Sequence, residues 1–117
     1  MEIWFNPSCS KCRVAKEMLD EAGVDYTVRR YLDDPPTAAE LEFVLDRLGL
    51  EPWDIARTSE PAAAEEGLAD LPKDRRQWID VMVRNPSLIQ RPIIVADDGS
   101  AVVGRSEDAV RQIIDHG

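Results

Sequence analysis

The first third of the chain contains two short apolar runs separated by a stretch with apolar residues at helical spacing. Residues 2–5 form a mostly apolar run, and turn residues follow at 6–8. Apolar side chains then recur every three or four positions, which predicts a helix over roughly residues 10–23. From 24 to 29 apolar and polar residues alternate, as in a half-buried strand. A strand-helix-strand unit of this kind favours parallel strands joined by a right-handed crossover.

The middle of the chain is predicted to be helical, with an irregular segment inside it. Thr37 and Glu40 have the spacing of a capping box ahead of an amphipathic helix. Residues 50–72 contain three prolines and an alanine-rich patch, which predicts loops with a helical turn or two. A further amphipathic helix is predicted after Asp74, and the Asn-Pro pair at 85–86 ends it.

The last third predicts a β-hairpin and a closing helix. Apolar runs at 92–96 and 101–104 flank an Asp-Asp-Gly-Ser turn, and Ser106 can cap a final amphipathic helix. The order is therefore βαβ, then helices, then ββα, which predicts an α/β fold. We expect one domain over residues 1–117, with a helical insertion at about 37–86, because no Gly/Ser-rich linker separates the parts.

Composition excludes several classes of function. The chain has 117 residues, of which 44% are hydrophobic and 32% charged, as in a folded domain. Its net charge of -9 repels a phosphate backbone, so nucleic acid is not expected as a direct ligand. No apolar run approaches the ~20 residues that a membrane-spanning helix needs. The N-terminus also lacks the pattern of a secretory signal, so we expect a cytoplasmic protein without membrane contact.

Two cysteines, Cys9 and Cys12, lie at the predicted start of the first helix. A disulfide between them would close too short a loop to stabilise the fold much. A structural zinc site needs about four ligands, and beyond this pair the chain offers only His116, which we expect to be a tail residue. We therefore predict no metal and no bound cofactor.

The position of the two cysteines favours redox or nucleophilic chemistry. Unpaired N–H groups and the macrodipole at a helix start favour the thiolate of Cys9. Cys12 lies one turn further, where it can attack a mixed disulfide formed at Cys9. The two residues could instead be small buried hydrophobic side chains. A Cys-x-x-Cys sequence within a βαβ unit makes the redox interpretation the better one.

The same helix start can bind an oxyanion. The N–H groups of Ser10, Lys11 and the next residue converge there. Because the chain is acidic overall, an anion would also need basic side chains from elsewhere. The candidates at non-helical positions are Arg57, Arg91 and Arg105.

Three motifs occur in order along the chain. They are Asn6-Pro-Ser-Cys-Ser-Lys-Cys-Arg13, Arg57-x-x-Glu60-Pro61 and Asn85-Pro86-x-x-Ile89-x-Arg91-Pro92-Ile93. With these motifs nearly the whole chain resembles the ArsC family of glutaredoxin-like arsenate reductases, within the ArsC and Spx superfamily. The resemblance implies a thioredoxin-like (glutaredoxin-like) sheet with a helical insertion between its halves.

The resemblance also implies roles for individual residues. Cys9 would be the nucleophile that attacks arsenate. Arg57 and Arg91 would hold the oxyanion and the thiol-arsenic adduct. Pro92 would be a cis-proline facing the cysteine loop, and Arg105 lies near the third arginine of the family.

Three positions depart from the family pattern. Reductases that depend on glutathione and glutaredoxin usually have one cysteine in the loop, whereas Cys12 supplies a second here, as in the Spx regulators. Phe5 stands where a histidine commonly precedes the Asn-Pro pair. Arg105 is followed by Ser106 rather than by proline.

The resulting hypothesis is thiol-dependent reduction of arsenate to arsenite through a Cys9 thiol-arsenate adduct. The second thiol could be a small thiol such as glutathione, followed by glutaredoxin. It could also be Cys12, in which case thioredoxin or a glutaredoxin-like partner would reopen a Cys9–Cys12 disulfide. Two alternatives stay open: an Spx-like redox-sensing regulator that binds RNA polymerase, and a thiol-disulfide oxidoreductase without arsenate activity.

Overall fold

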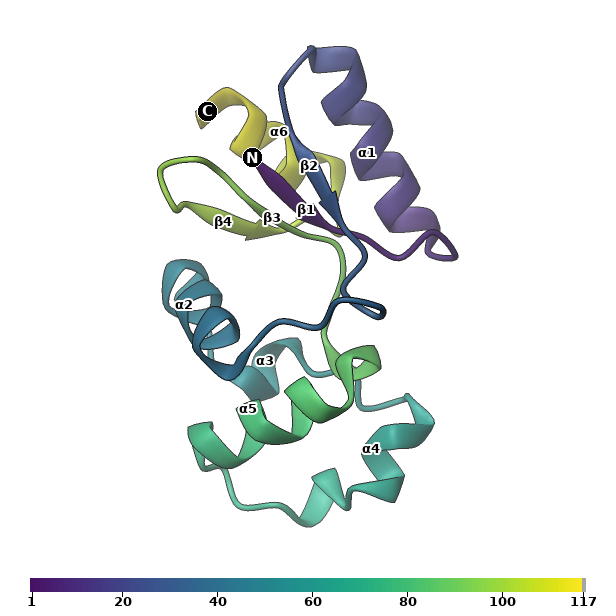
Figure 1. The fold of residues 1–117 in the computed structure, drawn as a ribbon, viewed down its shortest axis with the longest axis vertical. Helices are drawn as coiled ribbons and strands as arrows, with labels where there is room; N and C mark the ends of the chain where they lie inside the picture. Colours follow the sequence, from purple (N-terminus) through teal and green to yellow (C-terminus); the bar gives the residue numbers. More distant parts are fainter. Residues whose placement is uncertain (117) are drawn as a thin grey trace. The chain divides into compact units, whose positions relative to one another are not determined.

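In the computed structural model, which describes residues 1–116, the chain forms two units. The first unit combines Met1–Asp34 with the segment that starts at Arg91, and it contains the sheet. The second unit, Pro35–Gln90, contains helices and turns (Figure 1). It corresponds closely to the insertion predicted at about 37–86, while the grouping of both units into one domain stays a prediction.

The first unit is built on a four-stranded mixed sheet with the strand order β2-β1-β3-β4. β1 pairs in parallel with β2, and β3 pairs antiparallel with both β1 and β4. The parallel pair and the hairpin are both as the sequence pattern predicts, so the α/β class is confirmed. The strands are β1 (Glu2–Trp4), β2 (Thr27–Arg29), β3 (Ile93–Val95) and β4 (Ala101–Val103).

The second strand is shorter than predicted, because alternation over residues 24–29 suggested a start near residue 24. β2 is an edge strand, and among the strands of residues 1–116 it pairs with β1 alone. The N–H of Thr27 donates to the carbonyl of Met1 at 2.8 Å, and pairing starts from there. The edge position also leaves Val28 41% exposed.

The core of the first unit lies between the sheet and two helices, α1 (Ser10–Ala22) and α6 (Glu107–His116). The apolar residues of each helix recur at spacings of three or four, so they form one buried stripe. The helix α1 ends at Gly23 in the left-handed conformation (φ 69°), as expected for a C-terminal glycine. The fully or nearly buried core residues are Ile3, Ala15, Leu19, Ile94, Ala96, Val110 and Ile113.

A tight contact at Gly104 gives a first testable prediction. A Cβ atom there would lie 3.2 Å from side-chain atoms of Ile94, Pro92 and Val110, closer than ordinary van der Waals contact. We expect Gly104→Val to lower the free energy of unfolding by about 1–3 kcal/mol, the usual cost of overpacking. Urea denaturation measures this free energy, and Gly104→Ala should lower it by less than the valine variant does. A valine variant as stable as the wild type would contradict the contact.

The second unit begins with a capped helix, α2 (Ala38–Leu48). The capping box is confirmed, because the Glu40 N–H donates to Thr37 Oγ1 at 3.1 Å and the Thr37 N–H donates to Glu40 Oε1 at 2.9 Å. The helix α5 (Arg75–Arg84) starts after Asp74, whose carboxylate accepts from the N–H of Arg76.

The segment 50–72 is more helical than predicted. Its short helices are α3 (Pro52–Ile55), α4 (Pro61–Glu65) and the 3-10 turn η1 (Leu68–Asp70); a second 3-10 turn, η2 (Pro86–Leu88), follows α5. Two of the prolines that suggested loops are the first residues of α3 and α4, where the missing N–H costs nothing. Within residues 1–116, no helix combines the length and the apolar character that a bilayer crossing demands.

Candidate active site

The sheet topology brings four segments of the first unit to the same end of the strands. Because β1 and β2 are parallel, the segments that follow them leave the sheet at this end, and they carry Cys9 and Tyr31. The strand β3 begins at this end and the strand β4 finishes there, because β3 is antiparallel to β1 and to β4. Arg91 directly precedes β3 and Arg105 closely follows β4. Residues far apart in sequence therefore meet where α1 begins.

The loop before α1 holds Cys9 at the N-terminal cap position of the helix. The backbone of Cys9 is extended, and its N–H donates to the carbonyl of Asn6 at 3.0 Å. The side chain of Asn6 accepts from the N–H of Ser8, also at 3.0 Å. Arg13 fixes the loop from the other side, since its guanidinium donates to the carbonyl of Pro7 at 3.2 Å. The thiol of Cys9 is thus placed by local hydrogen bonds.

The surroundings of Cys9 favour its thiolate. Burial acts to raise the pKa of this thiol, but hydrogen bonds from the N–H and thiol of Cys12, from Arg91 and from the N–H of Lys11 outweigh it. The net result is a pKa below the ordinary value for cysteine. With 8% of its surface exposed, Cys9 remains accessible to a small reagent.

Cys12 has the opposite character. It is fully buried, and burial is the main reason why its pKa rises to about 12. A hydrogen bond with the backbone of Asn6 and the charge of Arg91 act in the other direction, while the negative charge of Cys9 adds to the rise. The pair is therefore unequal: Cys9 loses its proton first, and Cys12 stays protonated as a hydrogen-bond donor.

Arg91 is the guanidinium group that contacts Cys9. Burial would lower its pKa, yet the hydrogen bond to Cys9 and nearby negative groups raise it, so the side chain stays charged. The peptide bond between Arg91 and Pro92 is cis, which is the conformation that the family resemblance implied. The carbonyl of Arg91 accepts from Nη1 of Arg105 at 3.2 Å. Arg105 is thereby placed one contact away from the residue that touches Cys9.

The remaining predicted residues lie in two places. Ser10 and Lys11 are the first two residues of α1 and their side chains are exposed. Arg57 belongs to the second unit, where its N–H donates to the carbonyl of Leu88 at 2.7 Å and its guanidinium forms an ion pair with Glu60. Its role toward an oxyanion stays a prediction.

Tyr31 is a residue that the sequence analysis missed. It is fully buried two positions after β2, and its phenol is close enough to Arg91 to act on the guanidinium electrostatically. The signal in the sequence was the position of Tyr31 just after the second of two parallel strands, since side chains that follow parallel strands gather at the same end of a sheet. Tyr31 is therefore part of the surroundings of Arg91.

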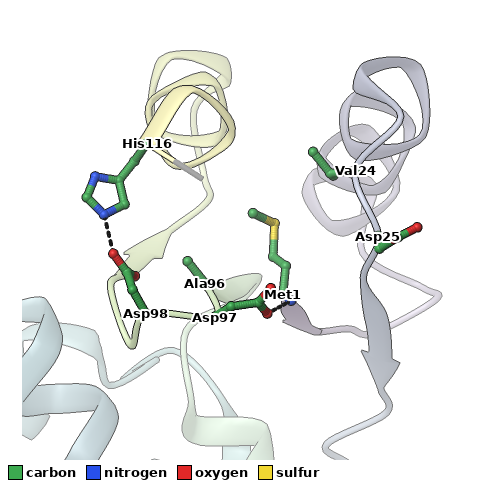
Figure 2. Close-up of a pocket in the computed structure, with 7 residues that line it drawn as sticks. All are labelled: Met1, Val24, Asp25, Ala96, Asp97, Asp98 and His116. Atoms are coloured by element: carbon green, nitrogen blue, oxygen red, sulfur yellow. Dashed lines mark hydrogen bonds and ion pairs between the residues drawn. The ribbon is translucent and has the colours of Figure 1, made fainter.

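A separate cavity of about 480 Å³ lies at the opposite end of the strands, where β1 begins and β3 ends (Figure 2). His116 Nε2 lies 2.6 Å from Asp98 Oδ2 and 2.9 Å from Ser100 Oγ. Hydrogen bonds from Ser100 and from His116 lower the pKa of Asp98 to about 2. His116, expected to be a tail residue, is instead the last residue of α6 and is fixed against the hairpin turn.

The unequal thiols lead to a prediction for chemical labelling. Because the pKa of Cys9 is lowered, its thiolate is present at a pH where an ordinary thiol is protonated, and Cys12 remains protonated there. Iodoacetamide should modify Cys9 before Cys12. The pH at which the labelling rate of Cys9 is half-maximal should be lower in the folded chain than in the chain unfolded in urea. Peptide mass spectrometry assigns the label. Faster labelling of Cys12, or equal midpoints for the folded and unfolded chain, would contradict the described site.

Comparison with known proteins agrees with this architecture. The sequence model of the ArsC family matches residues 4–113. An uncharacterized protein in the glnII region of Streptomyces viridochromogenes is 59% identical, over 97% of this chain and 98% of its own. An arsenate reductase of Neisseria meningitidis serogroup A is 33% identical, over 97% of each chain. The solved structure of an arsenate reductase from Vibrio cholerae gives a TM-score of 0.89 at 34% identity, covering 97% of this chain and 98% of that one.

The sheet order and the helix that Cys9 caps define a thioredoxin-like α/β protein. The match over residues 4–113 identifies it further, and the chain belongs to the ArsC family.

Proposed function

We propose that this protein is a thiol-dependent arsenate reductase in which Cys9 is the nucleophile. The observation that carries the proposal is the hydrogen bond between Arg91 and Cys9 at the start of α1. This contact puts an ionisable sulfur beside a charged guanidinium, which suits attack on a tetrahedral oxyanion. Membership of the ArsC family and relatives named arsenate reductase support arsenate as the substrate.

In the first proposed step the Cys9 thiolate attacks arsenic. An S–As bond forms, an As–O bond breaks, and the departing oxygen leaves as water after taking up protons. Arg91 and the helix N–H groups offset the negative charge of the reacting oxyanion. Arg57 is proposed to bind further oxygens of the same anion, as the family resemblance implies. Arg105, Ser10 and Lys11 are proposed to assist at the helix start.

In the second step another thiolate attacks the sulfur of Cys9. An S–S bond forms, the electron pair of the S–As bond passes to arsenic, and arsenic(V) leaves as arsenic(III) in arsenite. The attacking thiol is either a small thiol such as glutathione or Cys12, which contacts Cys9. Glutaredoxin or thioredoxin would then reduce the disulfide. Such a cycle needs a reducing compartment, so we propose a cytoplasmic location.

The test is arsenate-dependent oxidation of NADPH in two coupled systems. One contains glutathione, glutaredoxin and glutathione reductase, and the other contains thioredoxin and thioredoxin reductase. Arsenite should form in proportion to the NADPH consumed with at least one donor. If neither system forms arsenite above the rate without protein, arsenate is not the substrate.

A redox-sensing regulator is the second candidate, supported by the contact between the two cysteines. In that case the Cys9–Cys12 disulfide would be a signal rather than a turnover intermediate. Co-purification of RNA polymerase with the oxidised protein, together with no arsenate reduction, would favour this alternative. Thiol-disulfide exchange without any arsenate dependence would favour a general oxidoreductase.

A further inference from the structure

Tyr31 is a fully buried side chain with a polar group that the proposed mechanism does not use. Its hydroxyl oxygen is buried together with its ring. A tyrosine ring contributes to packing, but burying its hydroxyl group is costly unless polar atoms lie beside it. The hydroxyl group of Tyr31 therefore needs a polar neighbour in the interior of the first unit.

The register of the sheet places Tyr31 and Arg91 at the same level beyond the strands. Arg29 pairs with Trp4, and Trp4 pairs with Ile93, so these residues form one row across β2, β1 and β3. Tyr31 lies two residues after the Arg29 end of this row. Arg91 lies two residues before the Ile93 end. Because adjacent strands are about 4.8 Å apart, the row spans about 10 Å, a distance that two long side chains can bridge.

The turn that carries Tyr31 is held by its own hydrogen bonds. The N–H groups of Asp33 and Asp34 donate to the carbonyl of Arg30 at 3.0 and 2.9 Å. Nε of Arg29 donates to the carbonyl of Asp34 at 3.0 Å, which ties the turn back to β2. The backbone on both sides of Tyr31 is therefore held in place beside the sheet.

Arg91 connects this buried phenol with the reactive sulfur. Burial acts to lower the pKa of Arg91, whereas its hydrogen bond with Cys9 and the electrostatic effect of Tyr31 raise the pKa above its ordinary value. Nε of Arg91 is buried, as is the hydroxyl oxygen of Tyr31, so water screens their interaction little. One guanidinium group thus interacts with Cys9 and with Tyr31.

We propose that Tyr31 is a positioning residue, and that the negative end of its hydroxyl dipole holds the Arg91 guanidinium against the sulfur of Cys9. The proposal rests on the proposed function, in which Arg91 supports Cys9 as the nucleophile. An arginine side chain has many rotamers, and a second polar contact keeps it in the one that reaches Cys9. Tyr31 acts through Arg91 and takes no part in making or breaking bonds.

The test follows the ionisation of Cys9 and needs no arsenate. In a Cys12→Ser chain, which serves as the parent, Cys9 is the remaining thiol, and its iodoacetamide rate is measured against pH. Below the pH of half-maximal rate, Tyr31→Phe should slow the labelling by about fivefold, the effect of losing one polar contact of ordinary strength. The plateau rate at high pH should stay unchanged, because Cys9 is ionised there in both chains.

Tyr26→Phe is the matched control, because Tyr26 is the other of the two tyrosines. It directly precedes β2, at the opposite end of that strand from Tyr31, and its hydroxyl group donates to Asp20. The control removes the same group elsewhere in the first unit and should label like the parent. Tyr31→Met, which also lacks the hydroxyl group, should reproduce the effect of Tyr31→Phe. Urea denaturation checks that each variant folds.

A double-mutant cycle tests whether Tyr31 acts through Arg91. In an Arg91→Met background, Tyr31→Phe should no longer change the labelling rate of Cys9. Three results would overturn the proposal: unchanged labelling in Tyr31→Phe, an effect of the same size without Arg91, or an equal fall in Tyr26→Phe. Because arsenate is absent, a protein that fails to reduce arsenate can still pass this test, and an arsenate reductase can fail it.

Discussion

Cys9→Ser is expected to reduce arsenate-dependent turnover by roughly a thousandfold or more, which corresponds to about 4 kcal/mol of transition-state stabilisation. Hydrogen bonds lower the pKa of the Cys9 thiol below the ordinary value for cysteine, which favours the nucleophilic thiolate. A serine hydroxyl keeps its proton in the same place and cannot form the S–As bond. The rate of arsenite formation in both coupled systems measures the loss.

Ser8→Ala is the matched control for this variant. Ser8 lies in the same loop and is exposed, and the hydrogen bond it makes to Asn6 uses its backbone N–H, which alanine retains. It should keep wild-type turnover. Cys9→Ser should fold, because serine is close in size to the cysteine it replaces. Urea denaturation checks this. A folded Cys9→Ser protein that retains a tenth or more of the activity would refute Cys9 as the nucleophile.

The parts of the site that the sequence could predict are those with a local physical cause. The turn residues at 6–8 and the apolar spacing after them fix where α1 begins, and that position alone explains why Cys9 caps the helix. The spacing of Thr37 and Glu40 and the position of Asp74 likewise predicted helix starts that the structure confirms. The hairpin turn also depends only on neighbouring residues.

The parts that the sequence could not predict depend on contacts between distant segments. The contact of Arg105 with the carbonyl of Arg91 requires β3 and β4 to pair in one register. The burial of Tyr31 depends on the packing of a loop that carries no regular pattern. The prolines at the starts of α3 and α4 could not be interpreted from their neighbours alone, because a proline can end one element or begin another.

Cys12→Ser is expected to lose turnover with thioredoxin by about a hundredfold or more, since an intramolecular thiol has a high effective concentration. The chain contains two cysteines, so this variant leaves no second thiol to attack the adduct at Cys9. Thioredoxin would then have to attack the adduct itself, in an intermolecular step without that advantage. Undiminished turnover with thioredoxin would exclude Cys12 as the resolving thiol, and turnover confined to glutathione and glutaredoxin would assign the second step to the small thiol.

The same position also tests the hydrogen bond between the two cysteines. The thiol of Cys12 donates to the Cys9 thiolate and contributes to its lowered pKa. Serine can replace this donor and alanine cannot, so Cys12→Ala should raise the pKa of Cys9 above that of Cys12→Ser. The iodoacetamide rate of Cys9 against pH measures the difference. Equal midpoints of the Cys9 labelling rate in the two variants would show that Arg91 and the helix N–H groups stabilise the Cys9 thiolate without help from Cys12. The loss of thioredoxin-coupled turnover would still occur in both variants.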